Sequence, residues 1–366
     1  MEEWKKCKLG EFFELHRGYD LTKSEIKEGP YPVVCSTSIM GYHNEYKVKA
    51  PGVVIGRSGT LGEVQFIDTD YWPHNTSLYV SDFKGNSPKF IKYFLQLFGT
   101  GNVGGGSAVP TLNRNHLQAL TVRVPPLPTQ QKIAAILSSL DDKIELNNKI
   151  NTNLERQAQD LFKNWFVDKY EKEGTIGDYC AVKSGFAFKS AWWQDEGTKV
   201  IRIGDIEQGC LNLETCAHVA TDKIEVAKDF IVQGGDLVIA MTGATIGKFS
   251  MIPKTQKPIL VNQRVGKFFL GNNPLEKVPF IYCTLKQEEV ITEFINRGQG
   301  SAQPNISTGD ILSIPCWIPN KNEIDNFNKT IQPMFETIIS NQEENRKLSV
   351  LRDSLLPKLM NGEIEV

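Results

Sequence analysis

The chain lacks the features that mark membrane, secreted and zinc-ribbon proteins. None of its apolar runs approaches the ~18–20 residues that a membrane-spanning helix needs. The first residues, Met-Glu-Glu-Trp-Lys-Lys-Cys, contain no apolar core of a secretory signal. The seven cysteines are odd in number and include no Cys-x-x-Cys pair, which argues against a disulfide framework and a zinc ribbon. We therefore expect a cytoplasmic protein.

Motifs of catalysis are missing as well. The sequence has no Walker A motif, no dinucleotide-binding Gly-x-Gly-x-x-Gly, and no Asn/Asp-Pro-Pro-Tyr/Phe tetrapeptide of adenine amino-methyltransferases. No serine or cysteine stands in a nucleophile elbow. Metal-ligand spacing is absent among the histidines, which are His16, His43, His74, His116 and His218. The sequence therefore predicts neither a catalytic site nor a metal site in this chain.

Acidic residues are absent from two long tracts, although the net charge of −2 does not by itself suggest a nucleic-acid partner. The tract from Phe83 to Leu140 contains Lys84, Lys89, Lys92, Arg114, Arg123 and Lys132. The tract from Leu237 to Leu275 contains Lys248, Lys254, Lys257, Arg264 and Lys267. Two local positive faces would suit contacts with phosphates. Ordinary solvated faces are the more common origin of such tracts, so both interpretations stay open.

An internal repeat is the most informative feature of the sequence. Gly106-Ser-Ala-Val-Pro110 recurs 194 residues later as Gly300-Ser-Ala-Gln-Pro304. Upstream, the segment Gly52–Gly62 resembles Gly235–Gly247 at an offset near 185. Each half therefore consists of a globular part followed by a tail, and the chain is a duplication.

Each tail has the apolar spacing of a coiled-coil helix of about 35 residues, which corresponds to ~50 Å at 1.5 Å per residue. The first seam is Ile133, Leu137, Leu140, Ile144, Asn147, Asn151, Leu154, Ala158, Leu161 and Trp165. Addition of 194 gives the second seam, which is Phe327, Ile331, Met334, Ile338, Asn341, Asn345, Leu348, Arg352, Leu355 and Leu359. Asparagines in such a seam fix register, because each is satisfied only opposite another polar group. An antiparallel pair would bring Asn147 and Asn151 near Asn345 and Asn341. Two separately packed amphipathic helices are the alternative.

Local signals predict where the elements lie. Thr129 is the expected N-cap of the first tail, and Asn320 with Glu323 forms a capping-box pattern for the second. Pro333 should kink the second helix or mark a short first turn. The runs 53–55 and 237–240 predict buried strands, and the segments 88–98 and 279–295 predict helices.

Several motifs together resemble one family, the specificity subunits of type I restriction–modification systems. Val124-Pro-Pro-Leu-Pro-Thr-Gln-Gln-Lys-Ile-Ala-Ala-Ile-Leu137 resembles the start of their central helical region. Leu351-Arg-Asp-Ser-Leu-Leu-Pro-Lys-Leu-Met-Asn-Gly-Glu-Ile364 is similar to the end of their C-terminal helix. The resemblance covers the whole chain. Asn320-Lys-Asn-Glu-Ile324 departs from the family's Pro-Leu-Pro-x-Gln-Gln pattern, which leaves contacts there in doubt.

The resemblance implies an α+β protein with two mixed α/β target-recognition domains on two long helices that form an antiparallel coiled coil. The expected segments are a first recognition domain (1–126), a central spacer helix (127–172), a second recognition domain (173–319) and a C-terminal spacer helix (320–366). In the family each domain reads one half of a bipartite, asymmetric site in double-stranded DNA, and the helices set the unread gap. Two modification subunits and the restriction subunits are the implied partners in host defence. S-adenosylmethionine, ATP and magnesium would be bound by those partners and not by this chain.

Candidate DNA-binding residues present paired donors and acceptors to bases, or positive charge and hydroxyls to phosphates. They lie in the Gly-rich turns, in the segments that follow them and beside the repeated Gly-Ser landmark, with Ser36–Ser38 as a further candidate loop. The glycines of these turns are better explained by tight turns. For Arg57, Lys248 and Arg264, DNA contact and an ordinary surface role both stay open. The candidates are Arg57, Ser58, Thr60, His74, Asn75, Thr76, Asn113, Arg114, Arg202, Thr242, Thr245, Lys248, Asn262, Gln263, Arg264 and Asn305.

Two other classes of function remain alternatives. A stand-alone DNA methyltransferase or nuclease with diverged motifs would bind cofactor or turn over substrate by itself. A duplicated coiled-coil scaffold would bind protein, and replacement of Arg57 and Arg264 would leave its DNA affinity and salt dependence unchanged.

Overall fold

The protein was analysed as a computed structural model, which describes residues 4–57, 63–99, 114–207, 209–298 and 304–366. The chain forms two compact units. The first comprises residues up to Ile144 together with Lys347–Val366, and the second comprises Glu145–Arg346. Each unit thus joins one globular domain to the ends of both long helices, so the units divide the chain differently from the four expected segments. Within the described residues, no helix combines the length and the apolarity needed to span a membrane.

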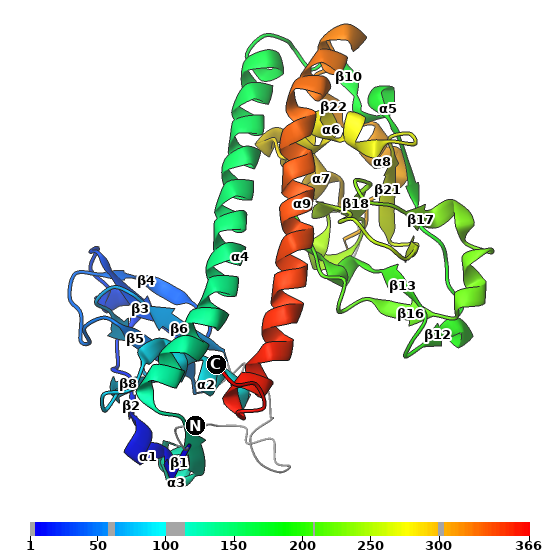
Figure 1. The fold of residues 1–366 in the computed structure, drawn as a ribbon. Coiled ribbons are helices and arrows are strands. Elements are labelled where there is room, and N and C mark those ends of the chain that lie inside the picture. Colours follow the sequence, from blue (N-terminus) through cyan, green and yellow to red (C-terminus); the bar gives the residue numbers. More distant parts are fainter. Residues whose placement is uncertain (1–3, 58–62, 100–113, 208, 299–303) are drawn as a thin grey trace. The chain divides into compact units, whose positions relative to one another are not determined.

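The first domain is built on two sheets, one antiparallel and one mixed (Figure 1). One sheet has the order β2-β8-β5-β6, with strands Glu14–Arg17, Ser77–Asp82, Gly52–Gly56 and Val64–Ile67. The other has the order β4-β3-β7, with strands Ile39–His43, Tyr31–Val34 and Trp72–Pro73, and its β3–β7 pair is parallel. A short antiparallel pair closes the domain, β1 (Lys5–Lys8) with β9 (Thr121–Val124). The helices are α1 (Leu9–Phe12), α2 (Pro88–Gly99) and α3 (Arg114–Ala119).

The second domain repeats this order of elements. Its first sheet is β11-β21-β18-β19, with strands Ala181–Ser184, Val265–Phe269, Leu237–Ala240 and Phe249–Met251. Its second sheet is β12-β16-β13-β20-β17, with strands Trp193–Gln194, Ala217–Val219, Thr198–Ile201, Ile259–Val261 and Ile231–Val232, and its β13–β20 pair is again parallel. The closing pair is β10 (Gly174–Thr175) with β22 (Pro315–Cys316), and β14 (Ile206–Glu207) with β15 (Cys210–Leu211) is an added hairpin. The helices are α5 (Ile176–Tyr179), α6 (Val278–Leu285), α7 (Glu288–Gly298) and α8 (Thr308–Leu312).

The predicted strands and the first predicted helix are confirmed, and one helix is corrected. The runs 53–55 and 237–240 lie in β5 and β18, and the segment 88–98 lies in α2. The segment 279–295 is two helices and not one, because α6 ends at Leu285 and α7 begins at Glu288. An apolar spacing can continue across such a break, so periodicity alone does not reveal it.

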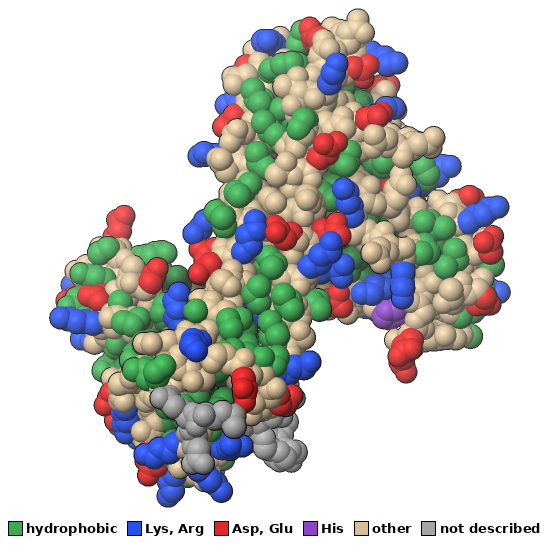
Figure 2. Space-filling view, in the orientation of Figure 1, with side chains coloured by type: hydrophobic (Ala, Val, Ile, Leu, Met, Phe, Trp, Pro, Cys, Tyr) green, Lys and Arg blue, Asp and Glu red, His purple; other side chains and the backbone are tan. Residues whose placement is uncertain are grey.

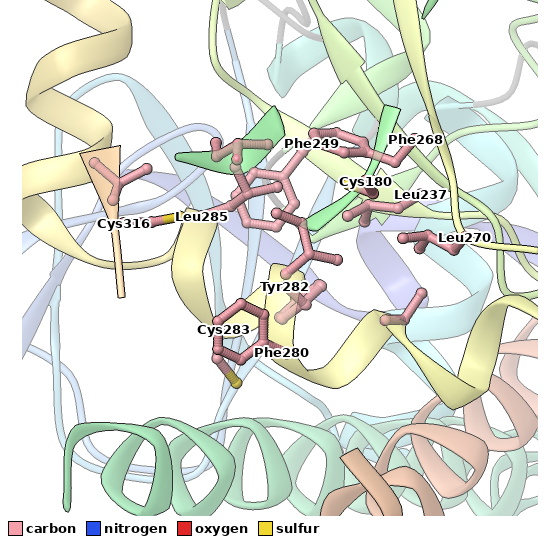
Figure 3. Packing of buried hydrophobic residues seen from close by; sticks show 14 of the residues in the cluster. Cys180, Leu237, Phe249, Phe268, Leu270, Phe280, Tyr282, Cys283, Leu285 and Cys316 are labelled. Atoms are coloured by element: carbon pink, nitrogen blue, oxygen red, sulfur yellow. The ribbon is translucent and has the colours of Figure 1, made fainter. Parts of the chain in front are cut away.

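The central strand of each domain is buried on both faces. In β18, Leu237 and Ile239 pack into the main core of the second unit, whereas Val238 and Ala240 pack into a separate cluster on the opposite face. A strand covered on both sides reads as an unbroken apolar run and not as an alternating one. Figure 3 shows the main core, where Phe280, Tyr282 and Cys283 of α6 lie beside sheet residues such as Leu237 and Phe268.

The two long helices are α4 (Leu127–Phe162), continued by a π-helical turn (Lys163–Val167), and α9 (Lys321–Met360). They run antiparallel, as the repeat of their seams predicts (Figure 1). The Nδ2 of Asn147 donates to the Oδ1 of Asn345 at 2.9 Å, and the Nδ2 of Asn341 donates to the Oδ1 of Asn151 at 2.8 Å. Since Asn147 is fully buried, these bonds lie inside the seam.

The helix starts differ from the expectation in one case. Because α4 begins at Leu127, Thr129 lies inside its first turn and is not the N-cap. Asn320 does cap α9, since its Oδ1 accepts the backbone N–H of Glu323 at 3.0 Å. The helix α9 continues through Pro333 from Lys321 to Met360.

Candidate nucleic-acid interface

In the first domain, loops from both sheets meet beside the start of β8. The backbone N–H of Arg57 donates to the carbonyl of Thr76 at 3.1 Å, and the Ser36 hydroxyl donates to the same carbonyl at 2.5 Å. A parallel bridge joins Tyr19 to His74. The structure therefore gathers Arg57 and the segment His74–Thr76 into one edge, which we call the first edge.

Side chains of the first edge are held by specific hydrogen bonds. The Nε2 of His74 lies 3.1 Å from the carbonyl oxygen of Leu21, and its Nδ1 lies 3.0 Å from the Thr76 hydroxyl. Since a carbonyl only accepts, Nε2 carries a proton, and in the neutral imidazole Nδ1 then accepts from the Thr76 hydroxyl. The Nδ2 of Asn75 donates to the carboxylate of Asp20. His74 therefore orders the edge, while Asn75 keeps a carbonyl oxygen that can accept from a base.

The second domain has a matching edge, made by the same backbone contacts. The N–H of Met241 donates to the carbonyl of Arg264 at 3.0 Å, as Arg57 does to Thr76. A parallel bridge joins Phe186 to Asn262, as Tyr19 is joined to His74. Asn262, Gln263 and Arg264 therefore occupy the positions of His74, Asn75 and Thr76. This is the correspondence that the two sequence segments suggest.

The second edge also includes the turn after β18. Thr245 donates its hydroxyl to the carbonyl of Thr242 at 3.3 Å, and the Lys248 side chain is exposed. An antiparallel bridge places Asn305 beside Thr242. The Thr242 hydroxyl is buried and has no hydrogen-bond partner, which is unusual for a buried polar group. We call Thr242–Lys248, Asn262–Arg264 and Asn305 together the second edge.

Arg202 lies next to this edge, because the N–H of Asn262 donates to the carbonyl of Ile201 at 2.9 Å. Its guanidinium is half exposed and already has protein partners. Its Nη2 donates to the Thr215 carbonyl at 3.3 Å, and its Nε lies 3.8 Å from the Asp205 carboxylate. Arg202 is thus oriented by the domain, although its exposed face is free to meet solvent.

Other candidates lie elsewhere in the chain. Ser58, Thr60 and Asn113 fall outside the described residues. Arg114 begins α3, which packs on α1 and β2 and is held there by the Gln118 side chain, 3.3 Å from the Leu15 carbonyl. Arg114 is therefore positioned by a helix and not by the turns of the first edge.

Sequence reasoning missed two residues that contact the first edge, Tyr19 and Asp20. Tyr19 is 39% exposed, and its hydroxyl lies 3.0 Å from that of Tyr79. Asp20 holds Asn75 and also lies 3.5 Å from the Arg17 guanidinium. The Tyr19–Tyr79 and Asp20–Asn75 contacts each join residues more than fifty positions apart. No local spacing in the sequence could therefore have indicated them.

The acid-free tracts do not leave all their cations available for phosphates. Lys92 is paired with Asp141 at 2.6 Å, and Lys267 is paired with the buried Asp236 at 2.9 Å. Lys89, Lys248 and other members of the tracts are exposed. On the face shown in Figure 2, basic and acidic side chains are interspersed. This face therefore carries no extended surface of one sign.

Four of the described cysteines, Cys180, Cys216, Cys283 and Cys316, are buried core residues. Burial raises the pKa of the Cys180, Cys216 and Cys316 thiols to about 12. Such thiols stay protonated near neutral pH, and a protonated thiol is a poor nucleophile and metal ligand. Among the described residues, no group of three or more His, Cys, Asp or Glu side chains is arranged to hold a metal ion.

Comparison with known proteins gives consistent matches. A profile of the type I restriction modification DNA specificity domain matches residues 1–156 and 168–351. The type I restriction enzyme MjaIX specificity subunit of Methanocaldococcus jannaschii is 28% identical in an alignment 289 residues long, and the alignment covers 72% of this chain and 65% of that protein. The HindI specificity subunit of Haemophilus influenzae is 25% identical over 334 residues, with 70% and 71% of the two chains covered. The chain thus spans slightly less than two thirds of the first of these relatives.

A solved structure shares the fold. The crystal structure of the type I restriction–modification S subunit from M. genitalium superposes with a TM-score of 0.61 at 19% identity. The alignment covers 97% of this chain and 96% of that one.

Proposed function

The chain belongs to the family of type I restriction–modification DNA specificity domains, and from this premise we propose that it is the DNA-reading specificity subunit of such a complex. Each recognition domain reads one half of a bipartite, asymmetric site in double-stranded DNA. The antiparallel helices α4 and α9 set the gap between the halves. The chain itself is not an enzyme.

The observation that carries this proposal is the duplicated edge. Equivalent backbone contacts hold His74–Thr76 in one domain and Asn262–Arg264 in the other, so the scaffold is repeated. The side chains at the three positions differ in every case. Asn, Gln and Arg present the paired donors and acceptors that distinguish adenine from guanine in the major groove. Two such edges with different side chains favour an asymmetric site with two separate blocks.

The proposed partners follow from the family. Two modification subunits dock on the helices, and restriction subunits complete an ATP-dependent endonuclease. S-adenosylmethionine, ATP and magnesium belong to those partners in this proposal. Exposed apolar side chains on the helices, among them Leu146, Ile150 and Leu351, suit a protein partner.

The test is to co-express the chain with the modification subunit from the same genome and to map methylated adenines by single-molecule sequencing. We expect two short blocks separated by a fixed gap. Arg57→Ala should alter the block read by the first domain, and Arg264→Ala should alter only the other block. Arg123→Ala is a control, because Arg123 lies on β9, which pairs with β1 and contains no residue of either edge.

Each other outcome has a definite meaning. A continuous recognition sequence would show that the two domains do not read separately. An active partner without any methylation would favour a scaffold that binds protein. Cofactor binding or turnover by the isolated chain would favour the enzyme alternative.

A further inference from the structure

A carboxylate on α4 joins three elements of the first unit. Asp141 accepts hydrogen bonds from the Lys92 ammonium at 2.6 Å and from the Tyr93 hydroxyl at 2.7 Å, both on α2 of the recognition domain. It also accepts from the Arg352 guanidinium of α9 at 2.8 Å. The Tyr93 side chain is 1% exposed, and the side chains of Lys92, Asp141 and Arg352 are 17%, 20% and 27% exposed. We call these four residues the polar hub.

The repeat identifies the counterparts of the hub in the second unit. Phe90-Ile91 and Leu95 of α2 match Phe280-Ile281 and Leu285 of α6 at an offset of 190, and the long helices match at an offset of 194. Lys92, Tyr93, Asp141 and Arg352 therefore correspond to Tyr282, Cys283, Phe335 and Ala158. All four counterparts are at most 1% exposed, and the rings of Tyr282 and Phe335 are in edge contact at 5.0 Å between centroids. The same place in the fold holds a charged network in one unit and a packed, largely apolar cluster in the other, where the buried Tyr282 hydroxyl has no hydrogen-bond partner.

Polar contacts of the second unit lie at other positions. The backbone N–H of Phe280 in α6 donates to the Oδ1 of Asn328 in α9 at 2.8 Å, and the Nδ2 of Asn328 donates to the Tyr179 hydroxyl at 3.0 Å. Lys286, which follows α6, is paired with Glu155 of α4 at 3.3 Å. These contacts join the second domain to α9 and to α4 through separate residues, whereas the single Asp141 carboxylate joins the first domain, α4 and α9 together.

The two arrangements constrain a domain differently. Apolar packing, as at the matching place of the second unit, is nondirectional and by itself specifies the rotation of a helix less tightly. Hydrogen bonds to a charged group are directional and stronger, and three of them from two sides fix both distance and rotation. Burial by itself raises the pKa of Asp141, but the bonds from Arg352, Lys92 and Tyr93 outweigh it, and the net pKa lies below its usual value. The carboxylate is therefore charged at every physiological pH.

We propose that Asp141 is a positioning residue that locks the orientation of the first recognition domain on the helix pair and so makes the complex selective for one gap length. The inference rests on the proposed function. It adds that gap selectivity depends on a side-chain contact at the domain junction as well as on the length of the helices.

The test uses the full chain in complex with its modification subunit. The DNA templates carry the mapped bipartite site with its native gap, or with a gap one base pair shorter or longer. Adenine methylation at altered-gap sites, relative to the native site, is measured for the wild type and three variants. Asp141→Asn should raise this ratio by about tenfold, the effect expected from the loss of a buried charged hydrogen bond. Arg352→Lys keeps the cation beside Asp141, and Glu155→Gln removes the charge that pairs with Lys286 in the second unit. Both variants should keep the ratio within about twofold of the wild-type value.

An unchanged ratio in Asp141→Asn, with normal methylation of the native site, overturns the inference. If that variant does not assemble, the double variant Asp141→Phe/Arg352→Ala gives the answer, because it introduces the apolar pair of the second unit. A raised ratio in the double variant supports the inference, and a wild-type ratio overturns it. If the wild type itself recognises no two-block site, the proposed function is wrong and the inference falls with it.

Discussion

Gly18 and Gly185 allow the close approach on which each edge depends. A Cβ at Gly18 would lie 2.6 Å from the carbonyl oxygen of Pro73 and closer still to that of His74. A Cβ at Gly185 would lie 2.5 Å from the carbonyl oxygen of Asn262. Real Cβ atoms essentially never come nearer than 3.0 Å to such atoms. Since the neighbours are backbone, alanine at either position must push the edge segment away from its bridge.

We expect Gly18→Ala to lower the free energy of unfolding of the first unit by about 1–3 kcal/mol, the usual cost of extra atoms in a packed site. For a unit of this size the midpoint of thermal unfolding should fall by about 2–4 °C per kcal/mol. Methylation mapping should show a weakened or altered block for the first domain only, and Gly185→Ala should affect only the other block.

Matched alanine substitutions control for the loss of glycine itself. A Cβ at Gly41 would meet only the Ile26 side chain at 3.7 Å, and one at Gly204 would meet nothing within 4 Å. Gly41→Ala and Gly204→Ala should leave the unfolding midpoint and both blocks unchanged. The reasoning is refuted if Gly18→Ala behaves like Gly41→Ala in both assays.

Three further changes test the interior of the protein. Asn147→Leu removes the donor to the Oδ1 of Asn345 and should lower the free energy of unfolding, measured in urea, by about 1–2 kcal/mol. The double variant Asn147→Leu/Asn345→Leu should recover this loss. Single variants as stable as the double variant would contradict a paired polar layer. Lys267→Met leaves the buried Asp236 carboxylate without its cation and should cost about 3–5 kcal/mol in the same assay, and a cost under about 1 kcal/mol would show that the pair is solvated. Because burial raises the pKa of Cys180 from 9.0 to about 12, its contribution is present below pH 9 and is lost as the pH rises toward 12. The free energy of unfolding of Cys180→Ala should therefore fall less steeply with rising pH over this window than that of the wild type. Identical slopes for the two proteins would refute this reasoning.

Features set by local periodicity could be predicted from the sequence. The seams of α4 and α9 follow from apolar spacing, and their antiparallel register follows from the asparagines at matching depth. The central strands follow from unbroken apolar runs. Helix starts do not follow from residue type alone: Thr129 has the residue type of a cap, but α4 begins at Leu127, and the Pro126 carbonyl already accepts the N–H of Gln130.

Features set by long-range contacts could not be predicted. Asp20 and Asn75 are separated by 55 positions, and Asp141 and Arg352 by 211. Their pairing depends on which strands and helices become neighbours, and a single sequence contains no trace of that choice. The same limit applies to Lys92 and Lys267, which count as free cations in a charge tract but are neutralised in the fold.

In the two edges, backbone atoms make the shared contacts that hold the segment, whereas the proposed function assigns base reading to the side chains. The contacts that the two edges share are made by backbone atoms: the bridge beside Gly18 or Gly185, and one N–H to carbonyl bond across the turn. Backbone contacts tolerate replacement of the side chains around them, and this chain already demonstrates it, since His, Asn and Thr in one domain stand where Asn, Gln and Arg stand in the other. Under the proposed function, substitution at these three positions would change the bases that are read and keep the shared backbone contacts, whereas substitution at the glycines would disturb those contacts.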